Sequence, residues 1–540
     1  INDVDVVGDI PFDEEIYLEI VEGLKDTTYS QAQITSIEEF FTNVLGNRGY
    51  AFAEVTGNPE VNEETSEVKL IFSVQPGNKT YTRKILFTGN DITQDHVLRR
   101  EMRQFEGAWT SDNSIEAGKV RLERLGYFKE VNVETIPVPG TDDQIDIVYS
   151  VEEETTGSVG GNIGYSDFGL MLGFNLQEQN FLGSGNTVGI GINKNIYSEM
   201  YNISYMNPYA TKDGVSLGYN LYFRETDYGE FNVANYLTNS NGFGAQFGYP
   251  ISDITRLGFN LTYDKTDIDI GNLPAREIYD FVAAEGNIFE TLTAQLSWQR
   301  VTLNRGLFPT DGASTAISVS STIPGSDLNY YRLNIRQRYY QPLTQDLVFG
   351  FQGELGYLDA YGDTEETPFF QNFYAGGPRS LRGFESNTLG PRSTDAPCYE
   401  FNYAEGICPN LIDIDGDGEL DTPYYNPYAN QTSRYRDAPI GGNIKIEGSL
   451  QLIFRLPFIE DQRSLRSAFF FDFGNVFSDN CKEYQINCSK PSIDDLRYSY
   501  GVGVTWITGF GPMSLAIAKP TNAGPRERTE EFQFTVGNVF

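Results

Sequence analysis

Apolar and polar residues alternate with a period of two through most of the chain after residue 157. The alternation is clear in residues 215–223 and returns at 257–263, 347–357 and 444–456. A period of two places successive side chains on opposite faces of a β-strand. Each segment therefore predicts a strand with one apolar face and one polar face.

One of these segments indicates what the polar faces meet. Between Tyr331 and Tyr339 the polar face carries Arg332, Arg336 and Arg338. Charged side chains are costly against lipid, so this face is predicted to line a wet lumen. We count about sixteen such strands, which predicts a 16-stranded antiparallel transmembrane β-barrel over residues 155–540. A soluble β-sandwich is the alternative, but it would not carry this much apolar aromatic surface.

Composition agrees with a barrel more than with membrane helices. The chain has 54 Gly, 34 Tyr and 37 Phe, with a hydrophobic content of only 39%. It has no uninterrupted apolar run of about 18 residues, the length that a spanning helix needs. Residues 274–286 break the strand pattern, because they begin at a proline and place apolar residues at helical spacing, which predicts a short helix in a loop.

The first 154 residues follow a different pattern, a repeat with a period of 77 residues. Gly49-Tyr50 returns as Gly126-Tyr127, and the strand-like Glu67–Val74 returns as Gln144–Val151. An amphipathic helix precedes each Gly-Tyr pair, which predicts two α+β units of the order β-α-α-β-β. Their apolar helix faces are Ile34, Ile37, Phe41, Val44 and Leu45 in the first copy, and Ile115, Gly118, Leu122 and Leu125 in the second.

Charge and residue usage exclude several classes of function. The formal charge is −36, and residues 1–154 carry 31 acidic and 13 basic side chains, or −18. Nucleic acid is therefore not expected as a partner, since it is bound by clustered Lys and Arg. His96 is the sole histidine, which excludes histidine-based triads and His-rich zinc sites. With no nucleotide-binding or nucleophile motif either, we expect neither an enzyme nor a cofactor.

Two further signals lie in polar, turn-rich segments. The cysteines form two close pairs, Cys398/Cys408 and Cys481/Cys488, which predicts two disulfides in an oxidising compartment, with reduced thiols or a metal site as the alternatives. The acidic stretch at 413–421 matches part of a calcium-binding loop, but Tyr424 stands where the bidentate glutamate belongs, so a solvated loop is favoured over weak calcium binding. The possible calcium ligands are Asp413, Asp415, Asp417 and Asp421.

A barrel closes by pairing its first and last strands, and both look weak here. The first, at about 157–166, is rich in glycine. The last, at about 529–540, is interrupted by Gly537 shortly before its end. Glycine weakens a strand because it has no side chain to pack. The residues that mark this predicted weak seam are Gly157, Gly160, Gly161, Gly164, Phe534, Gly537 and Phe540.

Several longer motifs resemble the BamA family of outer-membrane barrel-assembly proteins. They include Phe181–Asn186, Arg305–Gly312, Tyr374–Arg392, Phe469–Phe477 and the terminal phenylalanine. The N-terminal repeats resemble the POTRA domains of that family. Its members carry five POTRA units, so the resemblance implies a chain trimmed to the two nearest the barrel. We therefore expect POTRA domains at 1–80 and 81–154, followed by the barrel with a long extracellular loop at about 372–440.

The resemblance also implies a role for the glycine-rich loop. In the family, a loop arginine folds into the lumen and contacts an F-x-D motif on a barrel strand. The matching residues here are Leu381, Arg382, Gly383 and Phe384 in the loop, with Phe470 and Asp472 on the strand. A solvated arginine is the alternative. The family also has a glutamate on the preceding strand, where this chain has Gln451, and Glu447 is the nearest acid.

The function implied by the resemblance is insertion of other β-barrels into the bacterial outer membrane, with the N-terminal domains in the periplasm. The mechanism would be strand pairing at the weak seam. The implied partners are unfolded outer-membrane proteins, accessory lipoproteins of an assembly complex and outer-membrane lipids. A translocator of the two-partner secretion type is the alternative, because it shares the POTRA pair, the barrel and a similar loop arginine.

Overall fold

The fold was analysed in a computed structural model, and the chain divides into two compact units. One consists of Ile1–Gly157 and Glu178–Asn186, and the other of Ser158–Gln177 and Thr187–Phe540. The structure describes residues 1–9, 11, 23–25, 27–62, 65, 67–166, 169–231, 233–234, 236–270, 274–394, 438–456, 459, 464–482, 485, 488–508 and 511–537.

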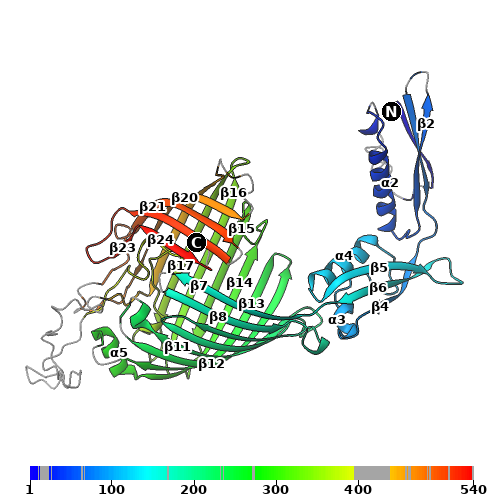
Figure 1. Ribbon diagram of the computed structural model, residues 1–540. Coiled ribbons are helices and arrows are strands. Elements are labelled where there is room, and N and C mark those ends of the chain that lie inside the picture. Colours follow the sequence, from blue (N-terminus) through cyan, green and yellow to red (C-terminus); the bar gives the residue numbers. More distant parts are fainter. Residues whose placement is uncertain are drawn as a thin grey trace, which may run out of the picture. The chain divides into compact units, whose positions relative to one another are not determined.

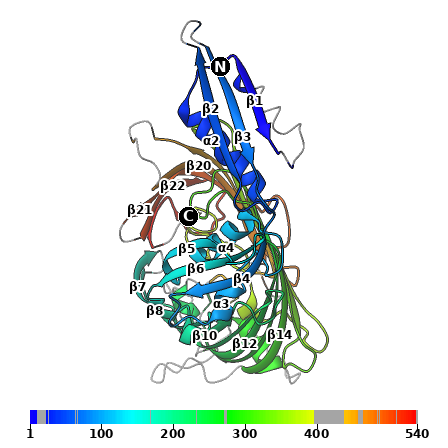
Figure 2. The ribbon, with the colours of Figure 1, turned by 90° about the vertical axis from the view of Figure 1, so that its right-hand side faces the viewer.

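The first repeat packs one face of helix α2 against a three-stranded sheet (Figures 1 and 2). The strand order is β1-β3-β2, with β1 parallel and β2 antiparallel to the central strand. Ile34 and Phe41 of the predicted apolar helix face are fully buried, as are Leu70 and Phe72 of the central strand. The elements are β1 (Asp3–Gly8), α2 (Gln31–Gly46), β2 (Glu54–Asn62) and β3 (Glu67–Gln75).

The second repeat has the same arrangement, with strand order β4-β6-β5. Its long helix α4 is capped by Ser111, whose side chain accepts a hydrogen bond from the N–H of Ser114, and such a cap satisfies an otherwise unpaired helix donor. Ile115, Leu122 and Tyr149 are buried in its core. The elements are β4 (Tyr81–Thr88), α3 (Asp95–Arg99), α4 (Asp112–Arg124), β5 (Phe128–Pro137) and β6 (Gln144–Glu153).

The repeated Gly-Tyr pair has a backbone explanation. Gly49 and Gly126 follow α2 and α4 with φ of +101° and +69°. Only glycine adopts this left-handed region without strain, so it commonly ends a helix. The order of elements confirms the predicted β-α-α-β-β arrangement in the second repeat, and in the first repeat the position expected for the first helix lies largely outside the described residues.

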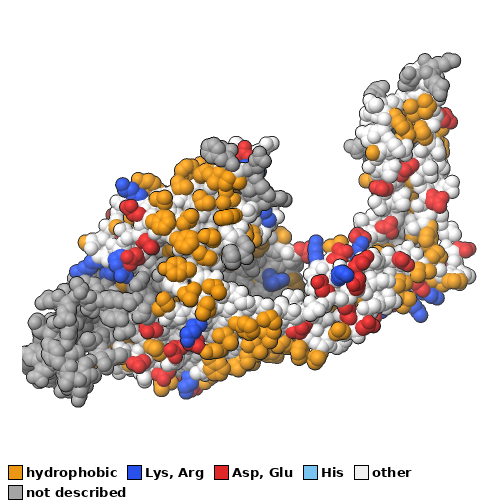
Figure 3. All heavy atoms as spheres, viewed as in Figure 1, with side chains coloured by type: hydrophobic (Ala, Val, Ile, Leu, Met, Phe, Trp, Pro, Cys, Tyr) orange, Lys and Arg blue, Asp and Glu red, His pale blue; other side chains and the backbone are white. Residues whose placement is uncertain are grey.

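The second unit is a closed antiparallel barrel of sixteen strands, as predicted (Figure 1). Large apolar side chains such as Phe223, Phe243 and Phe469 are exposed on its outer face. Figure 3 shows apolar side chains gathered over the barrel strands on the side in view. The strands are β7 (Gly157–Ser166), β8 (Gly169–Glu178), β9 (Thr187–Lys194), β10 (Ser198–Asn207), β11 (Ser216–Asp227), β12 (Leu237–Ser252), β13 (Thr255–Asp269), β14 (Ile288–Val301), β15 (Gly312–Thr322), β16 (Tyr330–Pro342), β17 (Leu347–Ala360), β19 (Ile444–Phe454), β20 (Leu465–Phe477), β21 (Arg497–Thr508), β22 (Gly511–Pro520) and β24 (Phe532–Val536).

Among the described residues, no helix is both long enough and apolar enough to cross a bilayer.

The loops of the barrel carry short elements of their own. The predicted loop helix is present as α5, and its Ile278 and Phe281 join a buried cluster with Leu381, Phe384 and Leu389 of the glycine-rich loop. Among the described residues of the second unit, that cluster has the most members, so part of the loop is buried in an apolar core. The remaining elements are α5 (Arg276–Glu285), β18 (Gly383–Phe384), β23 (Thr529–Glu530), and the 3-10 turns Phe181–Gly183, Tyr228–Phe231 and Phe369–Gln371.

The predicted last strand at about 529–540 is interrupted near its start, and its final residues 538–540 lie outside the described part of the chain. Residues 529–530 form β23, which pairs with β18 of the glycine-rich loop and not with a barrel strand. The barrel strand β24 covers only Phe532–Val536. The sequence pattern correctly predicted that residues 529–530 are extended. It could not show that they pair with β18, because periodicity carries no information about distant partners.

Candidate functional site

The glycine-rich loop brings Arg382 to the inner wall of the barrel, where it meets Asp472. Its Nε and Nη2 donate to the two carboxylate oxygens at 2.7 Å each, and its backbone N–H donates to Oδ2 at 3.2 Å. Arg382 is 6% exposed and Asp472 is fully buried. A bidentate pair of this kind compensates two charges that would otherwise be costly to bury.

Strand alternation explains how the wall forms this site. Phe470 and Asp472 are two residues apart on β20 and so share its inner face. The Arg382 guanidinium lies 3.4 Å from the centroid of the Phe470 ring. Ser449 on β19 is the register partner of Asp472, and its Oγ accepts from Arg382 Nη2 at 2.9 Å. A carboxylate, an aromatic face and a hydroxyl therefore surround one guanidinium.

Gln451, at the position of the family's glutamate, and Glu447, the nearest acid, do not take part in the hydrogen bonds that surround Arg382. Gln451 pairs in register with Phe470 and accepts from Arg466 Nη2 at 3.3 Å. Glu447 accepts a hydrogen bond from Ser380 and forms a salt bridge of 3.0 Å with Lys445. The second acceptor is Ser449, which lies between these two positions on the same face of β19.

Two glycines of the loop are needed for its close approach to other parts of the fold. Gly377 has φ +99°, and a Cβ there would lie 2.1 Å from the Ser386 hydroxyl oxygen. Gly390 has φ +94°, and a Cβ there would lie 2.2 Å from a methyl carbon of Val476. Both positions combine a left-handed backbone with no space for a side chain. The glycines therefore let the loop fold back on itself and against β20.

The far end of the loop is joined to α5, which lies between β13 and β14 outside the membrane-spanning strands. The N–H of Arg276 donates to the carbonyl of Thr394 at 2.8 Å, and the N–H of Thr394 donates to the Glu277 carboxylate at 3.0 and 3.1 Å. Burial raises the pKa of the Glu277 carboxyl, while the hydrogen bonds from Thr394 act in the opposite direction. The loop is thus held at both ends.

The second feature of the site is the seam between the first and last strands. Among the residues that the structure describes, β24 pairs with β7 through a single residue pair, Val536 with Tyr165. On its other side β24 pairs with β22 through five residue pairs. Among the described residues, β24 is therefore paired more sparsely with β7 than with β22.

The glycines predicted at the seam differ in how closely other atoms approach them. Gly164 and Gly537 face each other, since a Cβ on Gly537 would lie 3.3 Å from the Gly164 Cα and one on Gly164 would lie 3.0 Å from the Val536 carbonyl oxygen. Gly537 also has φ +83°, and its N–H donates to the Pro512 carbonyl at 2.7 Å. By contrast, no atom lies within 4 Å of a Cβ placed on Gly160. The first pair permits close backbone approach, whereas Gly160 is simply uncrowded.

The other predicted site residues divide between the described and undescribed parts of the chain. The disulfide between Cys481 and Cys488 is present. Cys398 and Cys408, the acidic stretch from Asp413 to Asp421, and Phe540 lie outside the described residues. In the described ranges no cluster of three or more His, Cys, Asp or Glu is placed to hold a metal ion.

Sequence reasoning missed two residues of the site, Ser449 and Gln533. Ser449 could have been found as the residue between Glu447 and Gln451 on the polar face of its strand. Gln533 is a buried polar residue between two outward phenylalanines, and its amide reaches the loop residues that follow Arg382. The sequence did show a polar side chain, Gln533, in a strand of aromatic residues. It did not show that this side chain contacts the glycine-rich loop.

Family comparisons match both parts of the chain. A family model described as the Omp85 superfamily domain matches residues 180–540. The POTRA model, described as a surface antigen variable number repeat, matches residues 1–77 and 80–154. Together these matches cover nearly all of the chain.

Individual relatives agree with the family matches. The outer membrane protein assembly factor BamA of Neisseria meningitidis serogroup B is 30% identical over 95% of this chain and 63% of its own length. The chain thus spans about three fifths of that relative. The crystal structure of Haemophilus ducreyi BamA lacking POTRA domains 1–3 has a TM-score of 0.82 at 31% identity, covering 99% of each chain. CdiB from Escherichia coli shares the fold at a TM-score of 0.52 and 12% identity.

Proposed function

Because this chain belongs to the BamA family of the Omp85 superfamily, we propose that it folds other β-barrel proteins and inserts them into the bacterial outer membrane. The barrel lies in the outer membrane and the POTRA repeats lie in the periplasm. We assign the repeats to residues 1–80 and 81–154 and the barrel to 155–540.

The sparse pairing between β7 and β24, one residue pair among the described residues, supports this proposal. An open strand edge offers unpaired N–H and C=O groups that can template an incoming strand. A substrate strand that adds to such an edge does not expose its backbone to lipid, which costs several kcal/mol for each unsatisfied group. Weak pairing at one seam of an otherwise continuous barrel therefore provides a place for strand exchange.

The other features have supporting roles in this mechanism. No bond is made or broken, so we infer that the protein is not an enzyme and needs no cofactor. The Arg382 loop braces the inner wall next to the last strands while the seam moves. We propose unfolded outer-membrane proteins, accessory lipoproteins and outer-membrane lipids as its partners, with the POTRA repeats receiving the periplasmic ones.

A reversible lock across the seam tests the mechanism. Tyr165→Cys and Val536→Cys would place two thiols on directly opposed residues, at a spacing that a disulfide can bridge. We expect the oxidised double variant to lose assembly of a barrel substrate into liposomes, and reduction to restore it. The matched control is Val319→Cys with Leu333→Cys, an opposed pair on the firmly joined strands β15 and β16. Undiminished assembly by the seam-locked protein would rule out strand exchange at this seam.

A further inference from the structure

Gln533 connects the last barrel strand to the loop that carries Arg382. Its side chain lies on the inner face of β24 and is 1% exposed. Its Nε2 donates to the Phe384 carbonyl at 2.8 Å, and its Oε1 accepts from the Gly383 N–H at 3.3 Å. These two backbone groups belong to the residues that directly follow Arg382. One amide therefore satisfies a donor and an acceptor of the loop in a place that water does not reach.

The contacts around Gln533 join the same two segments. β18 of the loop pairs antiparallel with β23, directly before β24. The N–H of Glu385 donates to the Arg528 carbonyl at 3.0 Å, and the two side chains form a salt bridge of 3.0 Å. A Cβ on Gly383 would lie 3.1 Å from the Ala518 Cβ, so the loop also packs closely against β22. The loop and the start of the last strand therefore form one connected structure.

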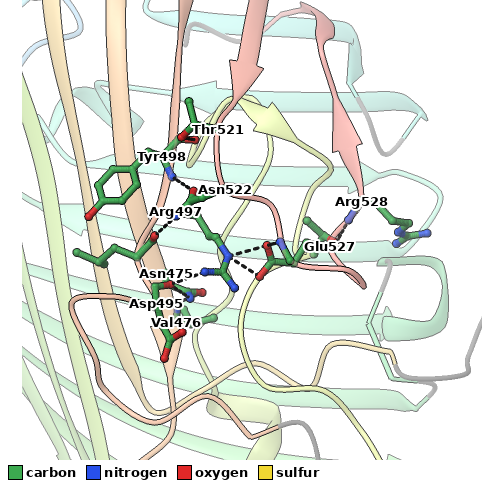
Figure 4. A network of polar contacts seen from close by, with 12 residues as sticks. Asn475, Val476, Asp495, Arg497, Tyr498, Thr521, Asn522, Glu527 and Arg528 are labelled. Carbon is green, nitrogen blue, oxygen red and sulfur yellow. Dashed lines mark hydrogen bonds and ion pairs between the residues drawn. The ribbon is translucent and has the colours of Figure 1, made fainter.

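The segment that leads into β23 is itself anchored to the start of β21 and to the residue before it (Figure 4). Arg497 Nε, at the start of β21, lies 2.8 and 2.7 Å from the two carboxylate oxygens of Glu527. The Tyr498 N–H donates to Asn522 Oδ1 at 2.9 Å, and Asn522 Nδ2 donates to the Leu496 carbonyl at 2.7 Å. β24 thus follows a fixed segment, and within the described part of the chain its far end meets β7 through one residue pair.

We propose that Gln533 is a positioning residue for strand exchange at the seam, because it transmits the position of the Arg382 loop to β24. With its two hydrogen bonds formed, the loop and β24 move as one body, and β24 is held where β7 can pair with it. Without them, β24 leaves β7 more often, whatever the position of the loop. This inference rests on the proposed function of the seam.

The first test measures the seam directly by electron paramagnetic resonance. Spin labels at Ile163 on β7 and Phe532 on β24, both on the outer face, report the distance between the two strands. Leaving a buried donor unpaired is costly, so Gln533→Leu should raise the separated population roughly tenfold. The control Thr505→Val removes a buried hydrogen bond of 3.0 Å to Ser514 on the neighbouring inner wall and should leave the population unchanged. A Gln533→Leu protein that behaves like this control overturns the inference.

The second test asks whether the effect passes through the loop. Arg382→Met should also raise the separated population, and the double variant with Gln533→Leu should rise no further than the stronger single variant. Residues that act through one connection are non-additive, whereas independent ones are additive in free energy. Effects that multiply in the double variant would show that the loop and Gln533 act on the seam separately, which contradicts the proposal.

A conservative variant separates positioning from folding. Gln533→Glu keeps the size and the acceptor, but an ionised carboxylate cannot donate to the Phe384 carbonyl. Lowering the pH from about 8 to about 5 protonates a buried carboxyl whose pKa is raised above the usual 4.3. The separated population of Gln533→Glu should then fall towards that of the unmodified protein, while that of Gln533→Leu should not. If both variants respond alike to pH, the donor has no such role.

Failure of this inference can be told apart from failure of the proposed function. If the seam has no part in assembly, the oxidised Tyr165→Cys and Val536→Cys variant keeps its activity with wild-type Gln533 in place. If Gln533 has no part in coupling, that lock still abolishes assembly but Gln533→Leu leaves the seam distance unchanged.

Discussion

At the scale of single residues, the pair between Arg382 and Asp472 should be far more sensitive to losing one partner than to losing both. Either single variant, Arg382→Met or Asp472→Leu, leaves one buried charge uncompensated and should lower the free energy of unfolding by about 3–5 kcal/mol. The double variant removes both charges and should cost clearly less than the sum. Urea unfolding in detergent, followed by the fluorescence of Trp506 on β21, measures these differences.

The control for this cycle is an arginine of the same inner wall that is not buried. Arg336 lies 3.2 Å from Glu354, with its side chain 66% exposed. Exposed pairs contribute little, so Arg336→Met should change the free energy of unfolding by less than about 1 kcal/mol. Additive effects of the two substitutions at 382 and 472 would contradict a direct pair.

The residues of this pair could be predicted because they lie in recognisable motifs, whereas the contact of Arg382 with Ser449 depends on strand register. Ser449 faces Asp472 only in the observed register of β19 against β20. A shift by one residue would bring Leu450 there and reverse the faces of the whole strand. Register is fixed by pairing between distant segments, so the local pattern of β19 does not contain it.

At the scale of elements, the last strand shows what periodicity can and cannot give. The inward and outward positions of β24 follow from alternation, and Phe532 is exposed while Gln533 is buried, as a strand requires. Its length does not follow, because residues 529–530 leave the barrel to pair with β18. The role of Gly164 and Gly537 in close backbone approach likewise becomes evident only from the position of β7 next to β24.

The facing glycines lead to a prediction about the seam. Gly537→Ala forces an L-residue into φ +83° and places a Cβ 3.3 Å from the Gly164 Cα. A left-handed alanine costs about 1–2 kcal/mol, so the rate of disulfide formation between Tyr165→Cys and Val536→Cys should fall roughly tenfold. Gly160→Ala is the matched control, since its Cβ would meet nothing within 4 Å. Equal rates in the two variants would mean that close approach at Gly537 does not matter for pairing.

At the scale of the whole molecule, the architecture could be predicted because strand alternation is a local pattern and the N-terminal domains repeat in the sequence. A period of two identifies each strand by itself, and a 77-residue repeat identifies two copies of one α+β unit. Neither signal predicts what occupies the lumen, because a loop inside a barrel and a loop outside it have similar sequences. The loop packs Leu381, Phe384 and Leu389 into a buried cluster, and two cavities lined in part by residues 371–380 measure about 410 and 460 Å³.

The position of this loop in the lumen distinguishes assembly at the seam from transport through the barrel. In a planar bilayer, the protein should conduct little ionic current, because the loop occupies the path. Arg382→Met removes the main polar attachment of the loop to the wall and should raise the current, while Arg338→Met, on the same inner wall but outside this attachment, should not. Oxidation of the thiols at Tyr165→Cys and Val536→Cys should abolish assembly without changing the current, since it closes the seam and leaves the lumen as it was. A large steady current through the unmodified protein, together with activity that survives this lock, would instead identify the lumen as the path of a translocator.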